Sequence, residues 1–245
     1  MTPAVDPARD RLIMALDVDT VDRADALVSV LAPHVGAFKI GFELFTAGGA
    51  KIVHRIREAG SGVFLDMKFL DIPNTVSRAA LVAARLGVTM LNVHATGGSE
   101  MMKRVVEVLE EASEKEGMTK PILLAVTVLT SMDDEDLMEV GFKRGVTSQV
   151  VELAKLAKTS GLDGVVCSAR EARGIKNLCG ESFVTVTPGI RPTGGDVHDQ
   201  KRILTAAEAV RGGADYLVVG RPISEADDPA GAARAVCNEI RQALS

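Results

Sequence analysis

The stretch Val63-Phe-Leu-Asp-Met-Lys-Phe-Leu-Asp-Ile-Pro-Asn-Thr75 joins an apolar strand to the start of a helix. Its first half is rich in Val, Leu and Phe, as expected of a strand that is buried on both faces. Pro73 occupies a position typical of the first turn of a helix, and a helical pattern continues through Asn74–Leu86. One strand followed by one helix is therefore the unit from which we predict the fold.

This unit recurs along the whole chain of 245 residues, at roughly 30 residues per repeat. The predicted strands are Leu12–Val18, Phe38–Phe42, Val63–Phe69, Met90–His94, Ile122–Leu129, Gly164–Ser168, Val184–Gly189 and Tyr216–Gly220. Eight such units in one stretch of this length predict a TIM (β/α)8 barrel. The alternative is a doubly wound open sheet, but the first strand ends Ala15-Leu-Asp-Val-Asp19, without a Gly-rich nucleotide fingerprint.

The composition is that of an ordinary soluble protein, with 47% apolar and 25% charged residues. A net charge of −5 argues against nucleic-acid or membrane partners, which favour a basic surface. The sequence has no signal-peptide pattern and no apolar run of membrane-spanning length, and its odd number of cysteines suggests reduced thiols. We therefore expect one cytoplasmic domain over residues 1–245, with residues 1–10 as a flexible extension.

Charged residues stand where the strands of such a barrel would end, which is where barrel enzymes place their chemistry. Strand alternation puts Asp66 and Lys68 on one face and the apolar residues Leu65, Met67 and Phe69 on the other. Asp17 and Lys39 come near the ends of the first two strands, on the faces that should point inward. Two carboxylates and two ammoniums in one mouth can keep each other ionised and fix each other's positions.

Structural explanations compete for each of these residues. Asp66 and Lys68 alone are also typical of an ion pair at a barrel rim, and Asp17 alone of a turn. Asp71 stands two residues before Pro73, so helix capping is an even alternative. The convergence of three strands favours a functional site.

The last two strands predict a phosphate site, because barrels often bind phosphate after strands seven and eight. Gly220 allows a close backbone approach and Arg221 supplies a guanidinium that matches phosphate oxygens. Arg191 and Gln200 belong to a Gly/Pro-rich loop typical of a mobile lid, with an ordinary surface loop as the alternative. The four histidines lack metal-ligand spacing, so we predict no metal site, and we read His94 as a hydrogen-bonded structural residue.

With these motifs in order, the chain resembles the orotidine 5′-monophosphate decarboxylase family of the short bacterial type. The central motif is Asp66-x-Lys68-x-x-Asp71-x-x-x-Thr75. The flanking matches are Leu16–Thr20, Phe38–Gly41, His94–Gly98, Val128–Met132, Pro188–Pro192, Asp199-Gln200 and Val219–Pro222. The resemblance implies a barrel of the ribulose-phosphate-binding type that converts orotidylate to uridylate and CO2, the last step of de novo UMP synthesis, without metal or cofactor.

The resemblance also implies a role for each matched residue. Lys68 would protonate C6 of the pyrimidine, with Asp66 beside the substrate carboxylate and Asp17 and Lys39 on the ribose hydroxyls. In a homodimer, further residues would complete the neighbouring site or approach the pyrimidine. Those expected across the dimer are Asp71 and Thr75, those near the pyrimidine are Thr130 and Ser131, and the phosphate ligands are Arg191, Gln200, Gly220 and Arg221.

Two other functions remain as alternatives. The first is a Mg²⁺-dependent sugar-phosphate lyase or decarboxylase, such as a hexulose-phosphate synthase, which shares the Asp-x-Lys-x-x-Asp strand. Those enzymes place a glutamate metal ligand on the second strand, where this chain has Lys39. The second is a barrel that binds a phosphate ligand without catalysis, which would leave the four alternating charges unexplained.

Overall fold

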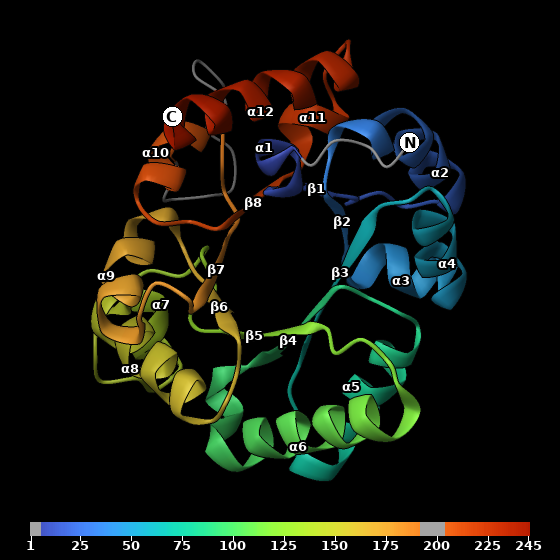
Figure 1. Ribbon diagram of the computed structural model, residues 1–245. Helices are drawn as coiled ribbons and strands as arrows, with labels where there is room; N and C mark the ends of the chain where they lie inside the picture. Colours follow the sequence, from blue (N-terminus) through green and yellow to red (C-terminus); the bar gives the residue numbers. More distant parts are fainter. Residues whose placement is uncertain (1–5, 192–203) are drawn as a thin grey trace.

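The computed structural model describes residues 6–191 and 204–245, and its parallel strands close into a barrel with helices around the outside (Figure 1). Each strand pairs with the next, and the last pairs with the first. The strands are β1 (Leu12–Ala15), β2 (Ala37–Ile40), β3 (Gly62–Phe69), β4 (Met90–His94), β5 (Ile122–Val126), β6 (Gly164–Val166), β7 (Val184–Thr187) and β8 (Tyr216–Val219). The predicted (β/α)8 barrel is confirmed.

The helices alternate with the strands along the chain. They are α1 (Pro7–Asp10), α2 (Val21–Leu31), η1 (Ala32–His34), α3 (Phe42–Gly48), α4 (Ala50–Glu58), α5 (Pro73–Arg85), η2 (Ala95–Gly97), α6 (Gly98–Glu116), α7 (Asp134–Glu139), α8 (Val146–Thr159), α9 (Ala169–Cys179), α10 (Ala206–Arg211), α11 (Arg221–Ser224) and α12 (Pro229–Leu244). The side chain of Thr20 caps α2, and Pro73 opens α5 as the sequence predicts. Within the described ranges, no helix has both the length and the apolar character needed to cross a bilayer.

Residues 7–10, which the sequence analysis placed in a flexible extension, instead form helix α1. The side chain of Asp6 accepts a hydrogen bond from the backbone N–H of Ala8, and Ala8 is buried. The next residues lead directly into β1, and α1 packs against α12. Helix α1 therefore lies at the amino-terminal end of the barrel, directly before β1.

Strand alternation divides the core into two layers. Along each strand, every second residue points outward against the helices, and this outer layer holds most of the buried apolar side chains. The other points into the barrel, and these residues form a separate inner cluster of Ile13, Ala15, Ala37, Phe64, Met90, Leu124, Val186 and Val218. The barrel below its carboxyl-terminal mouth is therefore filled with side chains, as in other barrels of this type.

Strand β3 departs from regular pairing just where the site residues lie. Leu65 pairs with Leu91 and Phe69 with Val93, so four steps along β3 match two along β4. Lys68, inside this bulge, has a φ of 43°, and it is the one non-glycine residue with positive φ in the described chain. Bulges commonly redirect a side chain next to an active site.

A buried ion pair ties the amino-terminal ends of β7 and β8 to α9. The Nζ of Lys176 donates to Oδ2 of Asp215 over 2.6 Å and to the carbonyl of Glu181 over 2.7 Å. The same carboxylate accepts from the backbone N–H of Thr185 over 2.8 Å. Because the Lys176 side chain is 2% exposed, the charge depends on these partners.

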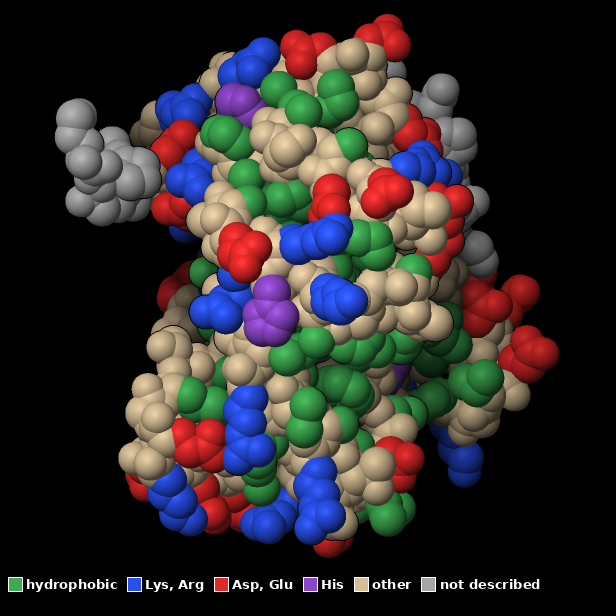
Figure 2. Space-filling view, turned by 90° about the vertical axis from the view of Figure 1, so that its right-hand side faces the viewer, with side chains coloured by type: hydrophobic (Ala, Val, Ile, Leu, Met, Phe, Trp, Pro, Cys, Tyr) green, Lys and Arg blue, Asp and Glu red, His purple; other side chains and the backbone are tan. Residues whose placement is uncertain are grey.

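One side of the molecule exposes large apolar side chains around β3 and α5. Phe42, Leu70, Ile72 and Val82 are each more than half exposed. A shallow apolar pocket of about 390 Å³ lies beside them, with Met67 among its lining residues. Figure 2 shows this side, with green side chains gathered across its middle between charged groups above and below. We call Phe42, Leu70, Ile72 and Val82 the apolar face, since a patch of this kind often marks a contact with another protein.

Candidate active site

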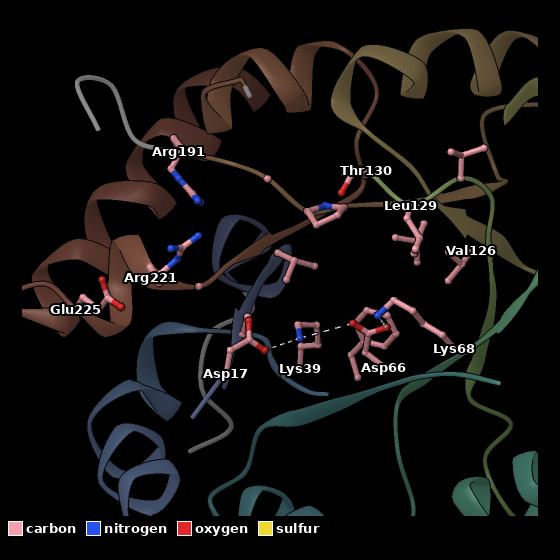
Figure 3. Close-up of a pocket in the computed structure, with 18 residues that line it drawn as sticks. Asp17, Lys39, Asp66, Lys68, Val126, Leu129, Thr130, Arg191, Arg221 and Glu225 are labelled. Atoms are coloured by element: carbon pink, nitrogen blue, oxygen red, sulfur yellow. Dashed lines mark hydrogen bonds and ion pairs between the residues drawn. The ribbon is translucent and has the colours of Figure 1, made fainter. Parts of the chain in front are cut away.

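A cavity of about 370 Å³ opens at the carboxyl-terminal ends of the strands (Figure 3). Its lining combines ionisable and apolar side chains from most of the strands. The polar and glycine residues around it are Asp17, Lys39, Asp66, Lys68, Thr130, Gly189, Arg191, Gly220, Arg221 and Glu225. The apolar ones are Ala15, Phe64, Val126, Val128, Leu129, Val166, Pro188 and Val218. A concave site of this size, with polar groups that converge on it between apolar side chains, suits a small polar ligand.

Four charged side chains form a row along one side of this cavity, in the order Asp17, Lys39, Asp66 and Lys68. The Nζ of Lys39 lies 2.8 Å from Oδ1 of Asp17 and 3.6 Å from Oδ2 of Asp66. The other carboxylate oxygen of Asp66 accepts from Nζ of Lys68 over 2.7 Å. The structure thus brings together the four charges that the sequence assigned to one mouth.

Asp66 is the most enclosed member of the row, with a side chain 11% exposed, whereas that of Asp17 is 61% exposed. Burial on its own raises the pKa of the Asp66 carboxyl. The charges of Lys39 and Lys68, together with hydrogen bonds from Lys68 and Asn92, outweigh burial and hold this pKa below its ordinary value. Asp66 therefore remains ionised at neutral pH, between two ammonium groups.

The ammonium of Lys68 is partly buried and lies between polar and aromatic groups. The ring of Phe42 is centred 5.7 Å from its Nζ, within the range of a cation–π contact. Burial lowers the pKa of the nearby His94, and the charge of Lys68 lowers it further, while Asp66 partly offsets both. His94 is thus neutral near pH 7 and adds no second positive charge beside Lys68.

Arg191 and Arg221 lie together at the left of Figure 3, and Lys68 lies at its right. Arg191 is 9% exposed and follows β7, while Arg221 directly follows β8 at the start of α11. A Cβ atom added at Gly220 would lie 3.4 Å from the Cβ of Ala15, so glycine leaves the backbone accessible at this part of the cavity lining. The cavity therefore has a pair of guanidinium groups in addition to the charged row.

Other predicted residues do not line the cavity of their own chain. Asp71 and Thr75 are exposed, and Ser131 is exposed beside the lining residue Thr130. Helix α5 has Ile72 as its N-cap, without a side-chain capping bond, and Asp71 accepts a hydrogen bond from the backbone N–H of Ile72. The capping alternative for Asp71 is therefore wrong. Gln200 lies outside the described residues.

Asn92 and Glu225 belong to the site or its support but are missing from the sequence-based set. Asn92 on β4 is fully buried and donates from Nδ2 to Asp66 over 2.7 Å. Its signal in the sequence is a polar amide within the apolar strand Met90–His94, at the same parity as Met90, which points inward. Glu225, one turn after Arg221, gives no comparable signal.

Cysteines and groups of possible metal ligands could also carry chemistry, apart from the charged row. Cys167, Cys179 and Cys237 are buried and free. Within residues 6–191 and 204–245, no three His, Cys, Asp or Glu side chains group in a way that could hold a metal ion.

Comparison with known proteins supports the resemblance seen in the motifs. Residues 10–236 match the model of the orotidine 5′-phosphate decarboxylase / HUMPS family. The chain is 51% identical over 234 residues to an orotidine 5′-phosphate decarboxylase of Moorella thermoacetica, covering 95% of this chain and 93% of that one. It is also 51% identical over 235 residues to one of Geobacter sulfurreducens, covering 96% and 98%.

A solved structure shares the fold as well as the sequence. The crystal structure of orotidine 5′-phosphate decarboxylase from Lactobacillus acidophilus superposes on this chain with a TM-score of 0.83, and its sequence is 40% identical. The match covers 94% of this chain and 98% of that one. The chain belongs to the orotidine 5′-phosphate decarboxylase / HUMPS family.

Proposed function

We propose that this protein is an orotidine 5′-monophosphate decarboxylase, which releases CO2 from C6 of the pyrimidine and yields uridine 5′-monophosphate. The observation that carries the proposal is the row of alternating charges that ends in Lys68, in one cavity with Arg191 and Arg221. Relatives at about half identity over nearly the full chain bear the same name. The reaction is the last step of de novo UMP synthesis.

The chemistry of the substrate explains why an ammonium is needed. Breaking the bond between C6 and the carboxylate leaves an electron pair in the plane of the ring, where no carbonyl can delocalise it. A preorganised positive charge then stabilises the developing carbanion, and Lys68 can supply both the charge and the proton. One proton moves from Nζ of Lys68 to C6, CO2 leaves, and the amine regains a proton from water.

Asp66 supports this role by holding Lys68 through a 2.7 Å hydrogen bond. In the proposed complex it also lies beside the substrate carboxylate, which its charge repels. We give stabilisation of the carbanion the larger share, because the attraction of the Lys68 ammonium grows as negative charge develops at C6. Asp17 and Lys39 would bind the ribose hydroxyls, while Thr130 and Ser131 would approach the pyrimidine.

The proposed phosphate ligands are Arg191, Gln200, Gly220 and Arg221. A guanidinium group can donate two parallel hydrogen bonds to phosphate oxygens. Gly220 has no side chain, so the phosphate can approach the backbone closely there. Because phosphate binding acts away from C6, its energy can organise the reacting end of the site and raise the rate. The cavity supports this use of remote binding energy, because the two arginines and the charged row line the same cavity.

The Mg²⁺-dependent alternative meets an obstacle at Lys39. The ammonium of Lys39 lies between the carboxylates of Asp17 and Asp66, at 2.8 Å and 3.6 Å. These are the oxygens that a divalent cation would take as ligands, and a fixed positive charge between them opposes its binding. We therefore propose a reaction that needs no metal.

Homodimer formation is part of the proposal, with Asp71 and Thr75 contributed to the partner's cavity. Both residues are exposed and absent from the lining of their own cavity. Asp71 lies between Leu70 and Ile72 of the apolar face in the sequence, and Thr75 follows Ile72 in the first turn of α5, so association through that face would carry both residues toward a second subunit. We also propose a cytoplasmic location, which the free thiols of the buried cysteines favour.

The direct test of the function is the ultraviolet absorbance change when purified protein meets orotidine 5′-monophosphate. We expect a loss of the absorbance due to the conjugated carboxylate, at a rate that a strong chelator of divalent cations does not alter. Absence of turnover would overturn the proposal, and complete inhibition by the chelator would favour the metal-dependent lyase.

Mixed dimers test whether Asp71 acts across subunits. The variants Lys68→Ala and Asp71→Ala are each expected to be nearly inactive. After subunit exchange, about half of the dimers contain one of each chain and one intact site, which restores about a quarter of wild-type activity. No gain on mixing, with exchange verified by mass, would show that Asp71 does not act in the partner's site.

A further inference from the structure

The bulge of β3 places Lys68 in a backbone conformation that L-residues rarely adopt. The backbone of Lys68 is bonded here by Asn92, on the neighbouring strand. Its side-chain Oδ1 accepts from the backbone N–H of Lys68 over 2.7 Å. A donor that the bulge removes from the regular strand ladder thus finds a partner in a side chain.

The other end of the same amide binds Asp66. Nδ2 of Asn92 donates to Oδ1 of Asp66 over 2.7 Å, and this oxygen also accepts from Nζ of Lys68 over 2.7 Å. A carboxylate only accepts and a backbone N–H only donates, so the two contacts fix which end of the amide is oxygen. Asn92 is therefore bonded to both residues of the Asp66-x-Lys68 unit, through a side chain in one case and the backbone in the other.

Asn92 is itself fully buried and is not among the residues that line the cavity. It therefore acts on the site through Asp66 and Lys68 and has no surface that a substrate could touch. Its position on β4 is held by pairing with Leu124 of β5. Both of its polar ends are used, as burial requires of an amide.

We propose that Asn92 is a positioning residue for the decarboxylation, which locks the backbone of Lys68 and the carboxylate of Asp66 in one geometry and thereby fixes the ammonium of Lys68 at the reacting carbon. The inference rests on the proposed function. It adds a residue outside the charged row, and it explains how a lysine in a left-handed conformation keeps one orientation.

Three variants separate positioning from simple packing. Asn92→Leu keeps the approximate size but loses both hydrogen bonds. Asn92→Asp keeps an acceptor for the backbone of Lys68 and, when ionised, loses the donor to Asp66. Thr89→Ala is a matched control on the residue before β4. The hydroxyl of Thr89 donates to the carbonyl of Val63 over 2.9 Å, so this substitution removes a hydrogen bond between the same part of the sheet and β3, away from the cavity.

The kinetic test compares kcat and KM for orotidine 5′-monophosphate, with Kd for uridine 5′-monophosphate by calorimetry as a check on the pocket. For Asn92→Leu we expect kcat to fall about 10²-fold, as a misplacement of about 1 Å can produce, with KM and Kd within about threefold of wild type. Thr89→Ala should keep kcat within about threefold. An Asn92→Leu kcat within threefold of wild type would overturn the inference.

The pH profile of Asn92→Asp gives a second reading that packing alone does not predict. The new carboxyl would face Oδ1 of Asp66, the oxygen that Lys68 also contacts, with Lys39 at the other oxygen of Asp66 and His94 on the same strand as residue 92. Two carboxyls so close share one proton, and the protonated form can again donate to Asp66. We expect the activity of this variant to rise as pH falls, whereas a pH profile parallel to that of wild type would contradict the proposal.

The outcomes for the two proposals are distinct. Absence of turnover in the wild-type protein overturns the proposed function and, with it, this inference. Turnover in the wild type together with an unaffected Asn92→Leu variant overturns the inference alone. If Asn92→Leu yields no folded protein, the pH profile of Asn92→Asp decides.

Discussion

Replacing Lys68 with alanine should reduce kcat by at least about 10⁴-fold. Loss of a general acid costs about 10²-fold at the low end, and loss of a preorganised charge at the reacting centre costs about 10²-fold more. Their product corresponds to about 5.4 kcal/mol of transition-state stabilisation. The geometry supports adding the two effects, because one ammonium, fixed by Asp66 at 2.7 Å, supplies both.

The same change also affects stability, and the assay has to separate the two effects. Asp66 keeps Lys39 at 3.6 Å and the amide of Asn92 at 2.7 Å, but it loses its nearest ammonium. Removing one partner of a buried ion pair costs about 3–5 kcal/mol, and the 27% exposure of the Lys68 side chain favours the lower end. Rates should therefore be measured well below the melting temperature of the variant.

The assay is single-turnover absorbance with enzyme in excess, and the control is Lys120→Ala. Lys120 also lies in ion pairs, 3.7 Å from both Glu110 and Asp163, with a side chain 30% exposed. It precedes β5 at the opposite end of the barrel, so its loss should leave kcat unchanged. If Lys68→Ala lost only about tenfold, or about 1.4 kcal/mol, the assignment of Lys68 as proton donor would be refuted.

Three further outcomes are expected. Arg221→Ala should lower kcat/KM for the nucleotide by roughly 10²-fold, because it removes two charge-assisted hydrogen bonds of about 1.5 kcal/mol each. Turnover of orotidine, which lacks the phosphate, should not change. An equal loss with both substrates would refute the phosphate role of Arg221. The lowered pKa of Asp66 means that its ionised form stabilises the fold above the ordinary carboxyl range and loses this effect as pH falls through the lowered pKa. Denaturant titrations should therefore show the advantage of wild type over Asp66→Asn shrinking below about pH 4, and a constant difference would contradict this reading. Lys176→Met should lower the free energy of unfolding by about 3 kcal/mol, since Asp215 keeps its bond from Thr185, with kcat unchanged in the cold; a loss under about 1 kcal/mol would show that the buried pair contributes little.

The barrel could be predicted because each unit carries its own local signals. Strand starts were found within a residue or so, whereas several ends were placed too late. Val128 and Leu129, for example, extended the fifth predicted strand, but they are apolar because they line the cavity, and β5 ends at Val126. Apolar residues that line a cavity and apolar residues of a buried strand give the same hydrophobic run in the sequence.

The charged row was predictable to the extent that strands alternate. Asp17, Lys39 and Asp66 follow the inward parity of Ala15, Ala37 and Phe64. Lys68 reaches the cavity from a bulge with a left-handed backbone, which strand alternation does not describe.

The contribution of Asn92 depends on pairing between strands that are 24 to 26 residues apart in the chain, and no local pattern reveals such a bond. Asp71 and Thr75 point to a similar gap, since the lining of one chain leaves them outside the cavity. A residue that acts through a neighbouring strand needs the tertiary structure to be found, whereas the role of Asp71 and Thr75 across a dimer stays a prediction from the resemblance.

The packed interior of the barrel has a consequence for the traffic of each catalytic cycle. Because Phe64, Met90, Leu124 and Val218 fill the space beneath the cavity, nothing can pass through to the far end. In the proposed mechanism, the nucleotide, carbon dioxide and the proton that recharges Lys68 would therefore all pass through the cavity opening at the carboxyl-terminal ends of the strands. The proposed reaction would thus need this single opening to exclude water while the bond to C6 breaks and to admit water afterwards, when the amine of Lys68 takes up a proton.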